Sequence, residues 1–215
     1  MHAVSPVAQE TIIKPVLEST TARQWSDEAL VAACQHGESA AFDELVRRYK
    51  NRVYNALYRF VGNHEDALDI SQEVFVRAYR GIADFRSNAK VYTWFYRIAV
   101  NLARNRLRDG SRRGRDKGTS LDGLAESAPA VASAATANGR TPRHAAEKSE
   151  LETMLKQCLE ELPEHYRTVF VLRTFEELSY EDIAATLECP VGTVRSRLNQ
   201  ARAKLRRRLE TLALL

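Results

Sequence analysis

Apolar residues recur at intervals of three and four positions through most of the chain, whereas the alternation typical of strands is hard to find. The pattern is clearest between residues 38 and 62, where Gly62 ends it. Such spacing places apolar side chains on one face of an α-helix, which then packs along that stripe. The stripe consists of Phe42, Leu45, Val46, Tyr49, Val53, Ala56, Leu57 and Phe60. We therefore predict an all-α fold.

The same reasoning predicts helices over about 27–36, 65–82 and 91–108, and then over about 149–162, 164–178, 179–188 and 190–209. Ser26 suits the N-cap of the first of these helices, and Gly37 suits its end. Ser179 is expected to accept a hydrogen bond from the N–H of Asp182, whose carboxylate would reach back. Pro190 suits a first helical turn, where its missing N–H costs nothing. Residues 179–209 therefore have the outline of a helix-turn-helix.

Composition changes abruptly at residues 109–149, which are rich in Gly, Ala, Ser and Thr and contain few large apolar side chains. Segments of this kind form flexible linkers. We predict two small helical domains, at 26–108 and 148–215, joined by a flexible linker at 109–147. Residues 1–25, with two prolines and scattered Ser and Thr, are expected to be a disordered extension.

The net charge of the 215 residues is only +4, so a nucleic-acid site has to show in how the charge is distributed. Cys34, Cys158 and Cys189 form no CxxC pair and lie near no histidine cluster, which argues against a disulfide framework and against a metal site. No cofactor motif is visible. The longest uncharged stretch, at 127–139, is too short and too polar to span a membrane, and no secretory signal is visible at 1–25. These features predict a cytoplasmic protein.

Residues 189–209 contain seven Lys or Arg and no acid. The apolar side of this helix consists of Val191, Val194, Leu198, Ala201 and Leu205. On the opposite side, Thr193, Ser196, Asn199 and Gln200 are flanked by Arg195, Arg197, Arg202 and Lys204. Amides and short polar groups can pair with base edges in a major groove while the cations meet phosphates. The alternative is a solvated amphipathic helix, but the lack of acids and the preceding turn favour binding to duplex DNA.

The predicted helix at 91–108 combines aromatic and basic residues. One arc is apolar and consists of Phe95, Ile98, Ala99 and Leu102. Another side holds Trp94, Arg97, Asn101, Arg104 and Arg108. Aromatic faces stack on unpaired bases and arginines follow the backbone, so this stripe, beside a polar loop at 83–90, suits single-stranded nucleic acid. The alternative is that Tyr92, Trp94 and Tyr96 are packing residues with solvated tips.

The helix at 65–82 has an acidic face instead. It is expected to bury Ala67, Ile70, Val74 and Ala78 and to turn Asp66, Asp69, Gln72 and Glu73 outward. An acidic face of this kind does not bind DNA. It is either solvated surface or a docking site for a basic protein partner, and periodicity does not separate the two.

Five stretches together resemble the extracytoplasmic-function sigma factors of bacteria, especially the sigma-E type. They are "AFDELVRRY", "DALDISQEVFVRAYRGIADFR", "YTWFYRIAVNLARNRLR", "LPEHYRTVFVLR" and "LSYEDIAATLECPVGTVRSRL". The resemblance covers about residues 27–108 and 148–210 in the family's order, and it implies that the two domains are sigma region 2 and sigma region 4. It further implies a non-enzymatic subunit that binds core RNA polymerase, recognises the −35 and −10 elements of promoter DNA and helps to melt the duplex. An anti-sigma factor as partner, a 1:1 complex with it, possible retention at the inner membrane and a stress-response regulon are also implied.

The resemblance also implies roles for individual residues. Docking on the clamp helices of the polymerase β′ subunit would fall to Asp66, Asp69, Gln72 and Glu73. Capture of an unstacked −10 base would fall to the loop residues Phe85, Arg86, Ser87 and Asn88, with Asn101 and Asn105 behind them. The pattern of the helix at 91–108 assigns Trp94, Arg97 and Arg104 to the same strand. In the last helix, Arg195, Ser196, Asn199 and Gln200 would face −35 bases, and Thr193, Arg197, Arg202 and Lys204 would meet phosphates.

Two other functions compete with that of a sigma factor. One is a conventional helix-turn-helix regulator with an N-terminal sensing or dimerisation domain, but such a domain has no need of a surface for single strands. The other is an enzyme that acts on nucleic acid. The five histidines form no H-x-E or HExxH group and there is no glycine-rich phosphate loop, which argues against an enzyme.

Overall fold

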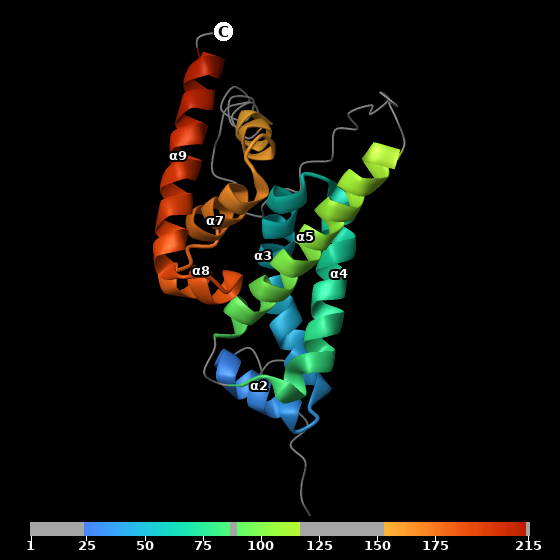
Figure 1. The fold of residues 1–215 in the computed structure, drawn as a ribbon. Coiled ribbons are helices and arrows are strands. Elements are labelled where there is room, and N and C mark those ends of the chain that lie inside the picture. Colours follow the sequence, from blue (N-terminus) through green and yellow to red (C-terminus); the bar gives the residue numbers. More distant parts are fainter. Residues whose placement is uncertain (1–23, 87–89, 117–152, 214–215) are drawn as a thin grey trace, which may run out of the picture.

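The computed structural model describes residues 24–86, 90–116 and 153–213 (Figure 1). Every regular element in these ranges is a helix, as the sequence pattern predicted. The N-module (24–116) consists of α2 (Asp27–Gln35), α3 (Ser39–Val61), α4 (His64–Gly81), the 3-10 turn η1 (Ile82–Asp84) and α5 (Val91–Asp116). The C-module (153–213) consists of a helical segment at 153–160 followed by α7 (Glu164–Thr174), α8 (Tyr180–Leu187) and α9 (Val191–Ala213). Most of the predicted linker and of the N-terminal extension lies outside the described residues.

The ends of the first two helices follow from their capping residues. The Oγ of Ser26 accepts a hydrogen bond from the N–H of Ala29 at 3.2 Å, as expected for an N-cap. Gly62 ends α3 with φ 77°, a left-handed conformation that glycine adopts at little cost. The predicted boundaries of α2 and α3 are therefore confirmed to within two residues.

Helix α5 is longer than the periodicity predicted, because it continues past Arg108 to Asp116. The sequence prediction ended at 108 since the following residues include Gly110 and have no apolar face. Once a helix is formed, however, each added residue gains a hydrogen bond, and Gly110 and Gly114 each cost only about 1 kcal/mol relative to alanine. The first residues of the segment predicted as linker are therefore helical.

The helix-turn-helix of the C-module is formed by α8 and α9. The N–H of Asp182 donates to the Oγ of Ser179 at 3.0 Å, which confirms this N-cap. The reciprocal bond differs from the prediction, since the Asp182 carboxylate accepts from the Ser179 hydroxyl at 2.7 Å and from two residues of the N-module. Pro190 lies just before α9, where its carbonyl accepts from the N–H of Thr193 at 2.9 Å.

The core is continuous between the modules, because one cluster of buried apolar residues includes members of α3, α4, α5, α7, α8 and α9. The predicted stripe of α3 is buried except for Val46, which is half-buried. All four apolar residues predicted for the buried side of α4 are buried. In α5 the buried face is broader than predicted and includes Tyr96, which is fully buried. Its predicted arc is only partly right, since Ile98 and Leu102 are half-buried.

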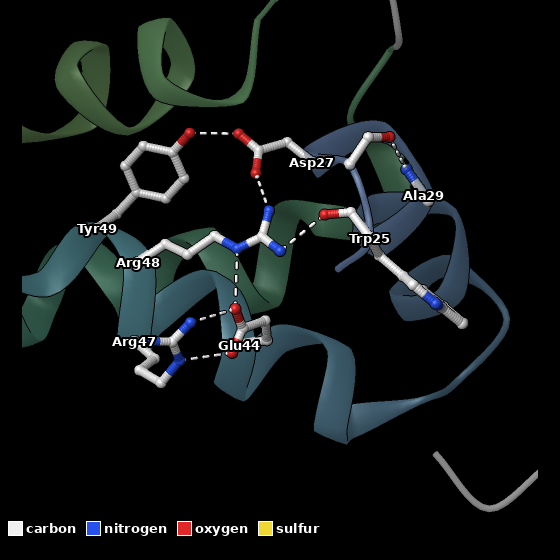
Figure 2. A network of polar contacts seen from close by, with 8 residues as sticks. Trp25, Asp27, Ala29, Glu44, Arg47, Arg48 and Tyr49 are labelled. Carbon is white, nitrogen blue, oxygen red and sulfur yellow. Dashed lines mark hydrogen bonds and ion pairs between the residues drawn. The ribbon is translucent and has the colours of Figure 1, made fainter. Parts of the chain in front are cut away.

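Helix α2 is held on α3 by a polar network around Arg48 (Figure 2). The Arg48 guanidinium donates to the Asp27 carboxylate at 2.8 Å, to the Glu44 carboxylate at 2.9 Å and to the Trp25 carbonyl at 2.7 Å. Tyr49 donates to the other oxygen of Asp27. Charge-assisted bonds of this kind are stronger than neutral ones, so the position of α2 is well defined. This matters because the end of α2 contacts η1.

Candidate nucleic-acid interface

A cavity of about 520 Å³ opens between the loop after η1 and the first turns of α5. Its walls include Phe85, Arg86, Trp94 and Arg97, four of the residues assigned from the sequence to the −10 element. The rings of Phe85 and Trp94 are 4.9 Å apart and inclined by 44°. Aromatic faces next to guanidinium groups can stack a base and neutralise its phosphate, and the volume is in the usual range for ligand cavities, about 300–1,000 Å³. The assigned Ser87 and Asn88 lie outside the described residues.

A second cavity, of about 590 Å³, lies further along α5. It brings together the assigned Asn101, Arg104 and Asn105 with Arg108, and it is closed on the other side by Glu164 and His165 of α7. Arg108 donates to the Asn105 side chain at 2.5 Å. The stripe predicted on α5 is therefore divided between two cavities, with the aromatic residues in the first and the amides in the second.

Gln35, at the end of α2, does not line the first cavity but supports the turn that forms one of its walls. Its side-chain amide donates to the carbonyls of Ile82 at 3.0 Å and of Phe85 at 2.9 Å. These two bonds fix the turn that presents Phe85 to Trp94. Sequence reasoning missed Gln35, because its partners lie about 50 positions away and are backbone groups.

Thr93 is a second residue that sequence reasoning missed. It lines the first cavity and is only 6% exposed, and its Oγ1 has no hydrogen-bond partner in the part of the chain that the structure describes. A buried hydroxyl is normally hydrogen-bonded, because leaving it unpaired costs about 1–3 kcal/mol. The wall of the cavity therefore includes a threonine whose buried hydroxyl has no partner among the described residues.

The outer face of α9 displays the residues assigned to the −35 element. Arg195, Ser196, Asn199, Gln200, Arg202 and Lys204 are exposed, and Thr193 and Arg197 are half-buried. The opposite face is anchored, since Val194, Leu198, Ala201 and Leu205 are buried. Ser196 already donates to the Thr193 carbonyl at 3.0 Å, so its hydroxyl remains available chiefly as an acceptor.

Helix α4 turns its acidic face outward, as predicted. Asp69, Gln72 and Glu73 are exposed, whereas Asp66 is half-buried and pairs with Arg106 of α5 at 2.5 Å. Three apolar residues that were not singled out from the sequence also project from α4, with exposed fractions of 44% for Leu68, 46% for Val76 and 54% for Tyr79. Apolar side chains surrounded by polar ones are typical of protein-binding surfaces. Leu68 and Val76 are eight positions apart, close to two helical turns, so they lie on the same side of α4 near Gln72, which the sequence could have indicated.

Other kinds of site find no support in the described ranges. No group of His, Cys, Asp or Glu there could hold a metal ion. Burial raises the pKa of Cys34 to about 11, so its thiol is protonated at neutral pH. Among residues 24–86, 90–116 and 153–213, no helix combines the length and the apolar character needed to cross a membrane.

Comparison with known proteins gives the same division into two parts. Sigma-70 region 2 matches residues 45–113, and Sigma-70, region 4 matches residues 152–205. RNA polymerase sigma-H factor of Pseudomonas aeruginosa is 41% identical over 190 residues, which cover 88% of this chain and 96% of that protein. ECF RNA polymerase sigma-E factor of Haemophilus influenzae is 42% identical over 192 residues, which cover 89% of this chain and 99% of that protein. The sigma-E factor of Escherichia coli K12 is 38% identical over 189 residues, which cover 88% of this chain and 97% of that protein.

Two solved structures have a similar fold. CnrH, in complex with the cytosolic domain of CnrY, matches with a TM-score of 0.61 and 25% identity, over 86% of this chain and 97% of that chain. The sigma factor RpoE of Bartonella quintana, in complex with the anti-sigma factor NepR, matches with a TM-score of 0.62 over 79% of this chain and 96% of that chain. At 22% identity, the second match bears on the fold alone. With two region matches in order and relatives near 40% identity over most of its length, the chain belongs to the extracytoplasmic-function sigma factors of the sigma-70 family, which are transcription initiation factors and not enzymes.

Proposed function

We propose that this sigma factor holds duplex DNA of the −35 element on α9 and an unpaired base of the −10 element in the cavity beside Trp94. The observation that carries the proposal is this cavity, in which two aromatic rings, Arg86 and Arg97 meet at the first turns of α5. A duplex has no unstacked base to offer such a cavity, whereas a melted strand does. Unstacking costs a few kcal/mol, and binding of the base in the cavity offsets this cost. In this way, capture of the base favours opening of the promoter.

The second DNA contact follows from α9. An anchored helix with amides and a serine at its centre and cations at its sides fits a major groove. In the proposal, Arg195, Ser196, Asn199 and Gln200 read −35 bases, and Thr193, Arg197, Arg202 and Lys204 bind phosphates. Because the two modules contact different parts of a promoter, binding by both is strongest when polymerase fixes their separation.

Core RNA polymerase would dock on α4. The carboxylates of Asp66, Asp69 and Glu73 provide charge complementarity to a basic partner such as the β′ clamp helices, and the amide of Gln72 can add hydrogen bonds. Leu68 and Val76, which are exposed on the same helix, would add apolar contact area to this surface. One of the two solved structures contains the anti-sigma factor NepR bound to a sigma factor, and the other contains CnrH bound to the cytosolic domain of CnrY. By extension, the proposal gives the present chain an anti-sigma factor as partner, a cytoplasmic location and a stress-response regulon.

Open-complex formation with core polymerase tests the proposal. Permanganate reactivity of unpaired thymines at −10 is measured for the wild type, Trp94→Ala and Ser196→Arg. We expect Trp94→Ala to retain promoter binding and lose most of the permanganate signal, since it removes a stacking face worth about 1–3 kcal/mol per base. Ser196→Arg is expected to lose promoter binding, because the larger side chain obstructs the groove. Equal permanganate signals for the three proteins would refute the proposal.

A further inference from the structure

The C-module lies against the N-module where the cavities open, and in Figure 1 α8 is placed beside the first turns of α5. Four ion pairs join described residues of the two modules, and in each the cation belongs to the N-module and the acid to the C-module. They are Arg52 with Glu176 at 3.4 Å, Lys90 with Asp182 at 3.1 Å, Arg97 with Glu188 at 3.6 Å and Arg104 with Glu164 at 2.8 Å. All four cations thus lie on the N-module. A cationic surface that binds phosphates would form the same pairs if carboxylates took the place of the phosphates.

The centre of this contact is buried. Glu176 is 5% exposed, accepts a hydrogen bond from the hydroxyl of the fully buried Tyr96 and pairs with Arg52. Arg52 also donates to the Glu176 carbonyl at 3.1 Å. The next residue, Glu177, has φ 58°, which is unusual for a residue other than glycine. The backbone is therefore held in a costly turn that directs Glu176 to the N-module.

The contact covers the proposed DNA site itself. Arg97 and Arg104 are both assigned to the −10 strand, and both are engaged by acids of the C-module. Ala185 of α8 forms part of the wall of the first cavity, and Glu164 forms part of the wall of the second. A strand that follows α5 would therefore have to displace α8 and the start of α7.

Asp182 connects this contact to the fold of the C-module. Its carboxylate accepts from Lys90 and from the Tyr92 hydroxyl, at 3.1 and 2.9 Å, while its N–H completes the N-cap of α8. Burial opposes ionisation of Asp182, but the hydrogen bonds from Ser179, Lys90 and Tyr92 outweigh this and lower its pKa. The acid is thus charged at neutral pH and well ordered.

We infer that the acidic face of the C-module, formed by Glu164, Glu176, Asp182 and Glu188, is a second interaction surface that imitates the phosphates of a single strand and competes with single-stranded DNA for the N-module. This inference rests on the proposed function, since it concerns access to the same cavity. It gives the free protein a closed state in which the −10 site is blocked, and the apparent affinity for a strand falls by the fraction of molecules that are open.

Binding of a fluorescein-labelled mixed-sequence 15-nucleotide single strand to the full chain, followed by anisotropy, tests the competition. The test variant is the double substitution Glu164→Gln and Glu188→Gln, whose side chains are 36% and 72% exposed, so the fold is retained. The control is Glu181→Gln with Glu210→Gln, which changes the net charge equally at exposed positions for which no contact with the N-module is seen in the described residues. We expect the test variant to bind about three- to tenfold more tightly than both the control and the wild type, because surface ion pairs each contribute modestly.

A second measurement uses the wild type alone. A carbodiimide joins an amine to a carboxylate in direct contact, so it is expected to link Lys90 to Asp182, whose charged atoms are 3.1 Å apart. Mass spectrometry should detect this cross-link in the free protein, and saturation with the same single strand should reduce its yield several-fold. An undiminished yield at saturation would overturn the competition.

Failure of the competition and failure of the proposed single-strand site give different results. If all proteins bind the strand and the test variant binds no more tightly than its control, the competition is overturned while the proposed single-strand site stands. If none of the proteins binds the strand, both the competition and the proposed site are overturned.

Discussion

Glu44 shows how a single carboxylate contributes to the fold of the N-module. It is 6% exposed, and it accepts two hydrogen bonds at 2.6 Å from Arg47 and one at 2.9 Å from Arg48 (Figure 2). Hydrogen bonds from Arg47, with smaller contributions from Arg48, lower the pKa of Glu44 to about 2 despite its burial. In the unfolded chain a glutamate titrates near pH 4.3. Between these two values the unfolded chain binds more protons than the folded one.

A pH dependence of stability follows from this difference. The contribution of Glu44 is complete above about pH 4.3, and it is lost as the pH falls towards about 2. We expect urea unfolding to show that Glu44→Gln is less stable than the wild type at pH 6, and that the gap narrows progressively at pH 4 and pH 3. Substitution of the exposed Glu65 by Gln is the control and should give no such convergence. A gap that is constant over this range would show that the charge of Glu44 is not what stabilises the α2–α3 junction.

Gln35 is the residue that connects this junction to the DNA site. Gln35→Ala removes two hydrogen bonds to the η1 turn, so we expect a loss of stability of about 1–2 kcal/mol. Because Phe85 is then less well held against Trp94, binding of a single strand should weaken several-fold. Gln157→Ala, at an exposed position of the C-module, is the control for both measurements. Unchanged single-strand affinity in Gln35→Ala would mean that the turn positions itself without this side chain.

At the scale of single helices, much of the structure could be predicted from local pattern. The caps at Ser26 and Ser179 and the stop at Gly62 depend on neighbours within a few positions, and these predictions are confirmed. The buried face of α5 was predicted less well. Tyr96 bonds to Glu176, which is 80 positions away, and no periodicity within α5 indicates that partner. A helix covered from two sides buries more than one stripe.

Helix α9 allows base contacts to be separated from phosphate contacts. We expect Asn199→Ala to change −35 sequence preference, with a loss of about 1–3 kcal/mol of discrimination at one base pair. Arg202→Ala should instead weaken binding to all sequences and reduce the slope of log affinity against log salt by about one. The measurement is binding of polymerase holoenzyme to promoter duplexes that vary in the −35 element, at several salt concentrations. Arg207→Ala, also exposed but nearer the end of α9, is the control.

If Asn199→Ala lowered affinity equally for all −35 sequences, Asn199 would not be reading a base. If Arg202→Ala changed sequence preference without changing the salt slope, the roles given to these two residues would have to be exchanged.

At the scale of the whole molecule, composition predicted two helical parts, but it did not predict that the parts touch. The family matches at 45–113 and 152–205 agree with the division into two parts. The docking of one module on the other depends on pairs such as Arg97 with Glu188 and Arg104 with Glu164, which are far apart in sequence. Charge counts for each helix separately do not reveal such pairs. The C-module also contributes to the walls of both cavities on α5, with Ala185 in the first and with Glu164 and His165 in the second.

The most direct measurement of the central claim is reconstituted transcription. Core RNA polymerase is incubated with fragmented genomic DNA of the source organism, with and without this chain, and the 5′ ends of the RNA are sequenced. We expect a set of start sites that depends on the chain and that shares two sequence elements, one near −35 and one near −10. Start sites that are the same with and without the chain would contradict its role as a sigma factor.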